Sequence, residues 1–239
     1  MSNASSDDAA RARVSKIPSV PWKPWLGVLF IVFIYYASQL FSGILLSVYP
    51  GLRGWSQTQA LDWLSESVGA QFTFILLAEV LSIGAIYLFL KRYKLGFASI
   101  GLKKPRWNDL FNGLLAVPVY FLLYVVTVGI VSHLVPGLDV DQEQQIGFNN
   151  VQGGLPLLLT FISLVVLPPL AEEIMVRGFL YSTLKKALPL IGAVILTSLL
   201  FASAHLPEGG AAGPLYIAAL DTFVLSLVLI YLREKTGSL

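Results

Sequence analysis

Residues 155–184 read LPLLLTFISLVVLPPLAEEIMVRGFLYSTL. This stretch begins as an apolar run and then carries three charged residues, Glu172, Glu173 and Arg177. A charged side chain near the centre of a bilayer costs roughly 2.5–3.5 kcal/mol on membrane-insertion scales. If the stretch crosses a membrane, the three charges are therefore candidates for a functional site.

The composition of the whole chain indicates a membrane protein. Hydrophobic residues make up 56% of the 239 residues and charged residues only 13%, whereas globular domains contain about 25% charged residues. The charges fall in short segments between long apolar runs. We therefore expect an all-α fold, a polytopic transmembrane helical bundle. The net charge of +2 does not indicate a nucleic-acid partner, and the lack of cysteine excludes disulfides, thiolate metal sites and a cysteine nucleophile.

Six apolar segments are long enough to cross a hydrocarbon core of about 30 Å. The expected spans cover residues 25–49, 68–90, 110–134, 155–184, 188–205 and 214–232. The first span is too long for a cleaved signal peptide, and it follows a polar tail at residues 1–24. The sequence thus predicts three parts, which are this tail, N-terminal transmembrane helices at 25–134, and a core at 150–239.

Basic residues occur in alternate loops along the chain. The tail, the loop from Lys91 to Arg106, the pair Lys185-Lys186 and the segment from Arg233 to Lys235 are basic, while the loops between them carry acidic residues. Basic loops favour the cytoplasmic side of a membrane. The pattern predicts an integral membrane protein with both termini in the cytoplasm, which we expect in the plasma membrane of a prokaryote.

The fourth span sets the depth of the charged motif. If it stopped at Leu170, Glu172 would lie at the edge of the bilayer, whereas Lys185-Lys186 gives a more natural interfacial end. We therefore expect the helix to continue and to place Glu172 near mid-depth. Pro168-Pro169 should kink this helix and free backbone carbonyls just before the acidic pair.

Helix geometry predicts different partners for the two adjacent acids. Glu173 and Arg177 are four residues apart with the acid first, which is the favourable order for a helical ion pair. Glu172 is rotated by about 100° from Glu173, so it is free to face another helix. His205, on the next span, is the only histidine at comparable depth, and Phe201 lies on the same helix face.

Glu172 and His205 together would suit water activation. A carboxylate in a low-dielectric pocket holds a proton more strongly than in water, so it can act as a general base near neutral pH. A neighbouring imidazole can orient or share the activated water. The pair could then attack a peptide carbonyl without a covalent enzyme intermediate.

The chain resembles the CPBP intramembrane proteases, which comprise the type II CAAX prenyl endopeptidases and bacterial proteins linked to bacteriocin processing and immunity. Glu172-Glu173-x-x-x-Arg177 is similar to the first motif of that family, and Phe201-x-x-x-His205 is similar to its second. The likeness is strongest over residues 150–239, with a looser one at residues 100–107. We therefore describe residues 150–239 as the expected CPBP protease-like core.

This resemblance implies an intramembrane endopeptidase in which Glu172 is the catalytic base and His205 its partner. Glu173, Arg177 and Phe201 would be supporting members of the motifs. The implied substrate is a peptide or protein in or near the membrane, either lipidated, as in CAAX-type processing, or a leader peptide. Membrane lipids are the other implied partners, with no nucleic acid and no cofactor.

The sequence departs from the family at its end. The family continues past Leu239 into a further helix whose His and Asn stabilise the oxyanion, and His133 comes too early in the chain to replace that His. We therefore expect the core to be truncated at its C-terminus and the natural reading frame to continue into a seventh span.

Other interpretations of the same residues remain open. The charged motif could be a structural interhelical cluster, and Glu79 and Asp221 are expected to serve packing or hydration. Zinc is a less favoured alternative, because HExxH is absent and a catalytic zinc site normally needs three protein ligands. A non-catalytic immunity or scaffold protein is one alternative function. A proton-coupled transporter using Glu79, Glu172 and Asp221 as proton sites is another, although the chain shows no broken-helix pair or inverted repeat.

The loop charges lead to a topology prediction. A reporter fused after Leu239 should be cytoplasmic, and one inserted near Asp139 should be external, because the basic loops all fall on one side. Protease protection of the two reporters measures this. An external reporter at Leu239 would show that the spans are miscounted around Pro168-Pro169.

Overall fold

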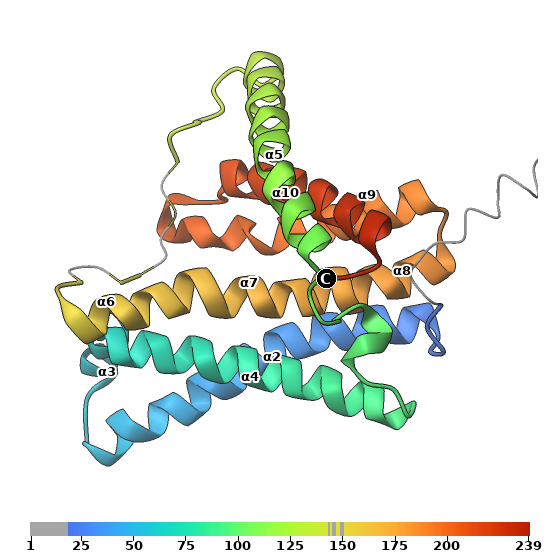
Figure 1. The fold of residues 1–239 in the computed structure, drawn as a ribbon. Coiled ribbons are helices and arrows are strands. Elements are labelled where there is room, and N and C mark those ends of the chain that lie inside the picture. Colours follow the sequence, from blue (N-terminus) through green and yellow to red (C-terminus); the bar gives the residue numbers. More distant parts are fainter. Residues whose placement is uncertain (1–18, 143, 145–146, 149–150) are drawn as a thin grey trace, which may run out of the picture.

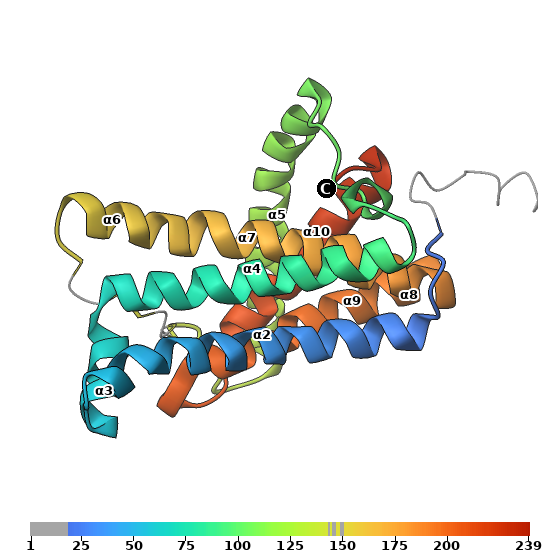
Figure 2. The ribbon, with the colours of Figure 1, turned by 90° about the horizontal axis from the view of Figure 1, so that it is seen from below.

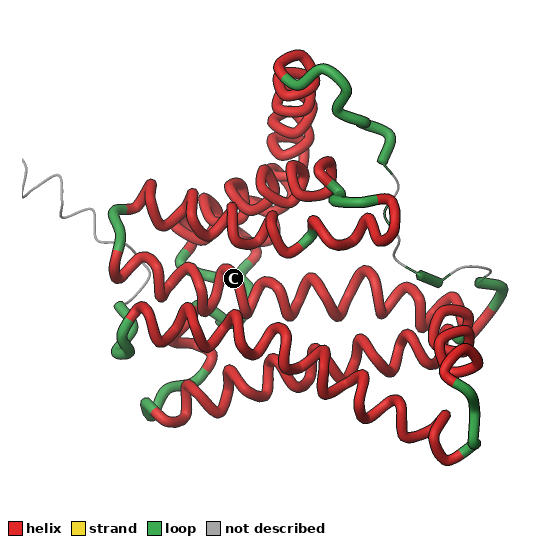
Figure 3. The backbone as a smooth tube through the Cα atoms, turned by 180° about the vertical axis from the view of Figure 1, so that it is seen from behind, coloured by secondary structure: helices red, strands yellow, loops and turns green. Residues whose placement is uncertain are grey.

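The computed structural model describes residues 19–142, 144, 147–148 and 151–239. Most of the expected polar tail, residues 1–18, lies outside the described residues. The described part is helical, without a strand (Figure 3). The expected all-α class is therefore confirmed.

The helices of the first half are α2 (Pro24–Leu52), α3 (Gln57–Glu66), α4 (Val68–Arg92) and α5 (Trp107–Leu134), with a short 3₁₀ helix η1 (Phe97–Ile100) before α5. The second half contains α6 (Gly154–Phe161), η2 (Ile162–Val166), α7 (Leu167–Glu172), η3 (Glu173–Leu180), α8 (Tyr181–Ala187), α9 (Leu190–Ala204), η4 (Leu206–Ala212) and α10 (Tyr216–Thr236). Within the described residues, six helical stretches are long and apolar enough to cross a membrane. The expected polytopic bundle of six spans is confirmed.

The fourth span is one continuous helical stretch, Gly154–Ala187, as expected. Pro168 and Pro169 do not end it. The turn before them, Ile162–Val166, is wound as a π-helix, a wider turn that often accompanies irregular hydrogen bonding inside a helix. Two prolines remove two backbone donors, and the π-turn lies where their missing bonds would have been made.

A short helix between the first two spans was not predicted. The helix α3 begins at a capping box, in which the Ser56 hydroxyl accepts from the Gln59 backbone N–H at 3.3 Å and the Gln59 side chain accepts from the Ser56 N–H at 2.9 Å. The sequence signal for it is Ser-x-x-Gln. Trp63 on this helix and Trp55 before it pack their rings against Tyr49 at the end of α2.

Three long helical stretches lie side by side, namely α2, α4 and the stretch from α6 to α8 (Figures 1 and 2). The helices α9 and α10 pack against each other beside them, and α5 projects at a steep angle from α10. No residue of α5 is buried. Its apolar side chains would therefore face lipid in a membrane.

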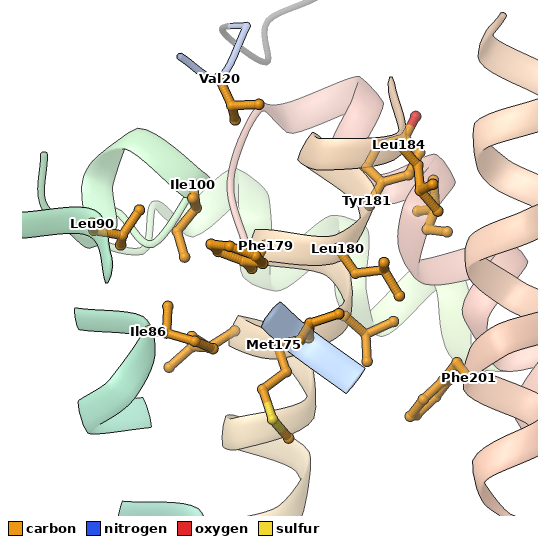
Figure 4. Close-up of a cluster of buried hydrophobic side chains, with 14 of the residues drawn as sticks. Val20, Ile86, Leu90, Ile100, Met175, Phe179, Leu180, Tyr181, Leu184 and Phe201 are labelled. Atoms are coloured by element: carbon orange, nitrogen blue, oxygen red, sulfur yellow. The ribbon is translucent and has the colours of Figure 1, made fainter. Parts of the chain in front are cut away.

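Phe179 is the centre of the apolar core. Figure 4 shows its ring between Ile86 and Ile100 on one side and Leu180 on the other. The ring of Trp22 stacks on Phe179 with centroids 5.0 Å apart, and the Trp22 indole N–H donates to the Thr183 hydroxyl at 2.9 Å. The residues that precede the first span are thus bound to the helix that carries the charged motif.

Arg233, in the basic segment that follows the last expected span, is buried. Its guanidinium donates to the carbonyl of Ile100 at 2.8 Å and to the hydroxyl of Ser182 at 2.7 Å. It also lies 5.5 Å from the centroid of the Tyr181 ring. Arg233 therefore links α10 to η1 and α8 instead of facing lipid headgroups.

The contact between α2 and α8 can be tested at Gly27. A Cβ atom added there would lie 2.6 Å from Thr183 Cγ2 and 2.8 Å from the indole nitrogen of Trp22. We expect Gly27→Ala to destabilise the protein by about 1–3 kcal/mol, because the core must shift to admit the methyl group. Thermal unfolding in detergent measures this.

Gly84→Ala is the matched control for Gly27→Ala, because Gly84 is also in a membrane-spanning helix and a Cβ there has no neighbour within 4 Å. Equal unfolding temperatures for the two variants would contradict the close packing of α2 on α8.

Candidate functional site

The charged motif lies at a change of helix type. Glu172 ends α7, and Glu173–Leu180 forms the π-helix η3, whose residues from Ile174 onward are buried. π-turns inside helices are rare and are frequent at functional sites. The irregular turn thus coincides with the two acids and the arginine that the sequence singled out.

Arg177 is held by one charge and one aromatic ring. Its Nε lies 3.4 Å from Glu173 Oε2, an ion pair without hydrogen-bond geometry. Its guanidinium carbon lies 4.2 Å from the centroid of the Phe201 ring, within the range of a cation–π contact. Only 1% of Arg177 is exposed, so both contacts act in a medium of low dielectric, where they are stronger than at a surface.

Phe201 also orients His205. The two rings meet edge to face, with centroids 4.8 Å apart and planes at 86°. Nδ1 of His205 lies 2.9 Å from the backbone carbonyl of Phe201. Because a carbonyl can only accept, Nδ1 carries the hydrogen, and Nε2 is the nitrogen that faces the site.

Nε2 of His205 faces two carboxylates. It lies 4.0 Å from Glu172 Oε1 and 3.9 Å from Glu208 Oε1. These distances are too long for direct hydrogen bonds. A water about 2.8 Å from both Nε2 and Glu172 Oε1 would make an angle of about 90° between them, so one water fits between the pair.

These three groups line a cavity of about 280 Å³. Tyr35 and Tyr36 of α2 form another part of its wall. The side chains of Glu172, His205 and Glu208 are 31%, 17% and 34% exposed. The cavity is therefore a partly enclosed space between membrane-spanning helices, with a largely apolar wall that carries these three ionisable side chains.

The structure brings together all five residues that the motifs singled out, namely Glu172, Glu173, Arg177, Phe201 and His205. Sequence reasoning missed Glu208 and the two tyrosines of α2, Tyr35 and Tyr36. The signal for Glu208 in the sequence was its position three residues after His205. Tyr35 had no signal, because its position depends on how α2 packs.

The other intramembrane acids have different surroundings. Asp221 accepts a hydrogen bond from the hydroxyl of Tyr120 on α5. Asp221 is not among the residues that line the cavity. Glu79 on α4 is half-buried and is not among the residues that line the cavity. In the described ranges, no group of three or more His, Asp or Glu side chains is arranged as a set of metal ligands.

Comparisons with known proteins agree with the resemblance seen in the motifs. Residues 154–239 match the family model described as type II CAAX prenyl endopeptidase Rce1-like, so the resemblance is confirmed over this segment. That family is a protease family. No curated protein matches the chain, and no solved structure matches it.

The unequal surroundings of the two adjacent acids predict unequal effects on stability. Glu173→Gln should lower the free energy of unfolding by about 1–3 kcal/mol, because Arg177 would remain buried without its counter-charge. Glu172→Gln should change it much less, since Glu172 faces the cavity. Glu66→Gln, on the exposed face of α3, is the control. Equal destabilisation by both substitutions in thermal unfolding would contradict this division.

Proposed function

We propose, starting from the Rce1-like match of residues 154–239, that the protein is an intramembrane endopeptidase in which Glu172 activates a water. The observation that carries the proposal is the distance of 4.0 Å between Glu172 Oε1 and His205 Nε2 inside a cavity between membrane spans. That gap accepts one water in contact with both groups. An acid and an imidazole at this separation are the parts that general-base hydrolysis requires.

The reaction would begin with a water held between the two groups. Glu172 takes one proton from the water as the water oxygen bonds to the peptide carbonyl carbon. The carbon–nitrogen bond then breaks, its electron pair stays on nitrogen, and the leaving amine takes a proton from the site. The products are a carboxylate and an amine, and the enzyme forms no covalent bond to the substrate.

This chemistry also depends on three supporting residues that act through their contacts with one another and with His205, namely Glu173, Arg177 and Phe201. The ion pair of Glu173 with Arg177 neutralises two charges of the motif. Phe201 contacts Arg177 with its ring face and His205 with its ring edge. The orientation of the imidazole therefore depends on a ring that the buried guanidinium holds in place.

The substrate that fits this site is a peptide or protein segment at the membrane. A type II CAAX prenyl endopeptidase acts beside a lipidated C-terminus, and we propose CAAX-type processing for this chain, with leader-peptide processing as the related possibility. Tyr35 and Tyr36 line the cavity from α2. In this proposal, the N-terminal helices at 25–134 complete a site whose motifs come from a protease core at 150–239.

We also propose the location that the loop charges predict. The protein would lie in the plasma membrane of a prokaryote, with both termini on the cytoplasmic side. Six spans are consistent with this proposal, because an even number returns the chain to its starting side.

Glu172→Gln tests the proposed activity. We expect this substitution to lower kcat for cleavage of a prenylated peptide by at least about 10²-fold, because the neutral amide cannot take the proton from water. The measurement is hydrolysis of a quenched fluorescent peptide by purified protein, with a non-prenylated peptide alongside.

Glu66→Gln should keep the wild-type rate in the same assay, since Glu66 is exposed on α3, away from the cavity. Turnover by Glu172→Gln at the wild-type rate would contradict the role of Glu172. Inert wild-type protein that still binds the peptide would favour a scaffold or immunity function instead.

A further inference from the structure

The cavity beside Glu172 is buried on one side and open on another. Its wall residues on η3, such as Met175, are buried. Among the described wall residues, the exposed ones are Val32 and Tyr36 of α2, which are 45% and 65% exposed, and Ser203 near the end of α9. The cavity therefore opens between α2 and α9, and we call these three residues the α2–α9 opening.

The α2–α9 opening exists because the two helices are joined through other helices. Each of them packs against η3 and against α8, and Figure 1 shows the stretch from α6 to α8 running between them. In the described part of the chain, α2 and α9 have no extensive packing against each other. Their outer edges therefore leave the cavity uncovered on the side away from η3.

The α2–α9 opening lies at the depth of the hydrocarbon core. Tyr36 is about 18 Å along α2 from Pro24, because an α-helix rises about 1.5 Å per residue. A hydrocarbon core is about 30 Å thick, so this position is closer to its middle than to either surface. The neighbouring exposed residues of α2 are apolar, namely Leu29, Phe33 and Leu40. The opening therefore faces lipid in a membrane.

The ends of the cavity are occupied by contacts within the protein. Toward α8, the indole N–H of Trp22 donates to the Thr183 hydroxyl at 2.9 Å. Toward η4, the side-chain amide of Gln144, in the segment between α5 and α6, donates to Glu208 Oε2 at 2.5 Å. These contacts leave the side between α2 and α9 as the open one.

We propose that the α2–α9 opening is the substrate entrance, and that its occupant is a peptide anchored in the bilayer by a lipid chain, which moves sideways from the lipid to Glu172. The inference rests on the proposed function and defines how its substrate arrives. In hydrocarbon, the N–H and C=O groups of an extended peptide have no hydrogen-bond partners. Glu172 and His205 offer such partners inside the cavity, so an extended peptide is better accommodated there than in the lipid.

Photo-cross-linking tests the entrance without any cleavage. Tyr36 is replaced by benzoylphenylalanine in a Glu172→Gln background, and the protein is reconstituted in phosphatidylcholine vesicles. The probes are the prenylated peptide of the cleavage assay and its non-prenylated counterpart. Irradiation should join the prenylated peptide to position 36 at least about tenfold more than the other, because the lipid chain holds it in the bilayer.

Phe41 is the matched control position. It is an aromatic residue of α2, 59% exposed, and is not among the residues that line the cavity. At about 100° per residue it points about 140° away from Tyr36. Benzoylphenylalanine at Phe41 should capture little of either peptide. Equal capture of the prenylated peptide at both positions would overturn the inference, as would equal capture of both peptides at position 36.

Blocking the entrance tests its use during turnover. The chain has no cysteine, so Tyr36→Cys and Phe41→Cys each provide one thiol for a bulky maleimide. In vesicles, the label should lower the cleavage rate of Tyr36→Cys at least about tenfold relative to its own unlabelled rate, because it fills the opening. The label on Phe41→Cys should leave the rate unchanged.

Equal rate ratios for the two labelled proteins would overturn the entrance. Failure of the proposed function has a different signature, because wild-type protein would then not cleave the prenylated peptide at all. The cross-linking pattern would still decide whether the peptide reaches position 36 from the lipid. It also decides the matter if the label on Tyr36→Cys unfolds the protein.

Discussion

The buried guanidinium of Arg177 is the group around which the site is arranged. A cation inside a membrane-spanning bundle must be compensated, and here Glu173 supplies the charge and the face of Phe201 supplies the second contact. Phe201 in turn meets His205 edge to face and accepts the Nδ1 hydrogen through its carbonyl. The direction of the His205 Nε2 atom therefore follows from the way in which Arg177 is buried.

The apolar core holds this polar arrangement at a fixed place. Phe179 lies two residues after Arg177 on the same π-helix, and its ring stacks on Trp22. Gly178 has no side chain, so the side chains of Ile100 and Leu239 can approach it closely. A Cβ atom added at Gly178 would lie 3.1 Å and 3.2 Å from them. The turn of the helix that follows the charges is therefore packed tightly, which limits how far the motif can move.

Much of the fold could be predicted from the sequence, because membrane spans need long apolar runs and charges are expensive inside them. The six spans and the continuous helix through Pro168-Pro169 follow from these two rules. The pairing of Glu173 with Arg177 follows from helical spacing. The proximity of Glu172 and His205 required the family resemblance as well, since helix periodicity alone does not say which helices are neighbours.

The remaining features depend on tertiary packing. Glu208 follows the last turn of α9, where the chain winds as a 3₁₀ helix, so its direction could not be taken from α-helical spacing. Tyr35 reaches the cavity only because of the rotation of α2. Arg233 looked like an interfacial residue, yet the carbonyl of Ile100 and the hydroxyl of Ser182 provide partners inside the bundle.

The central claim is that Glu172 and His205 act on one water as a unit. A double-mutant cycle on kcat/KM with Glu172→Gln, His205→Gln and the double variant measures this directly, because residues that act together have non-additive effects. We predict that the double variant is about as slow as the slower single variant. If the fold-losses in kcat/KM of the two single variants multiply in the double variant, the two residues act independently. That result would contradict a water shared between them.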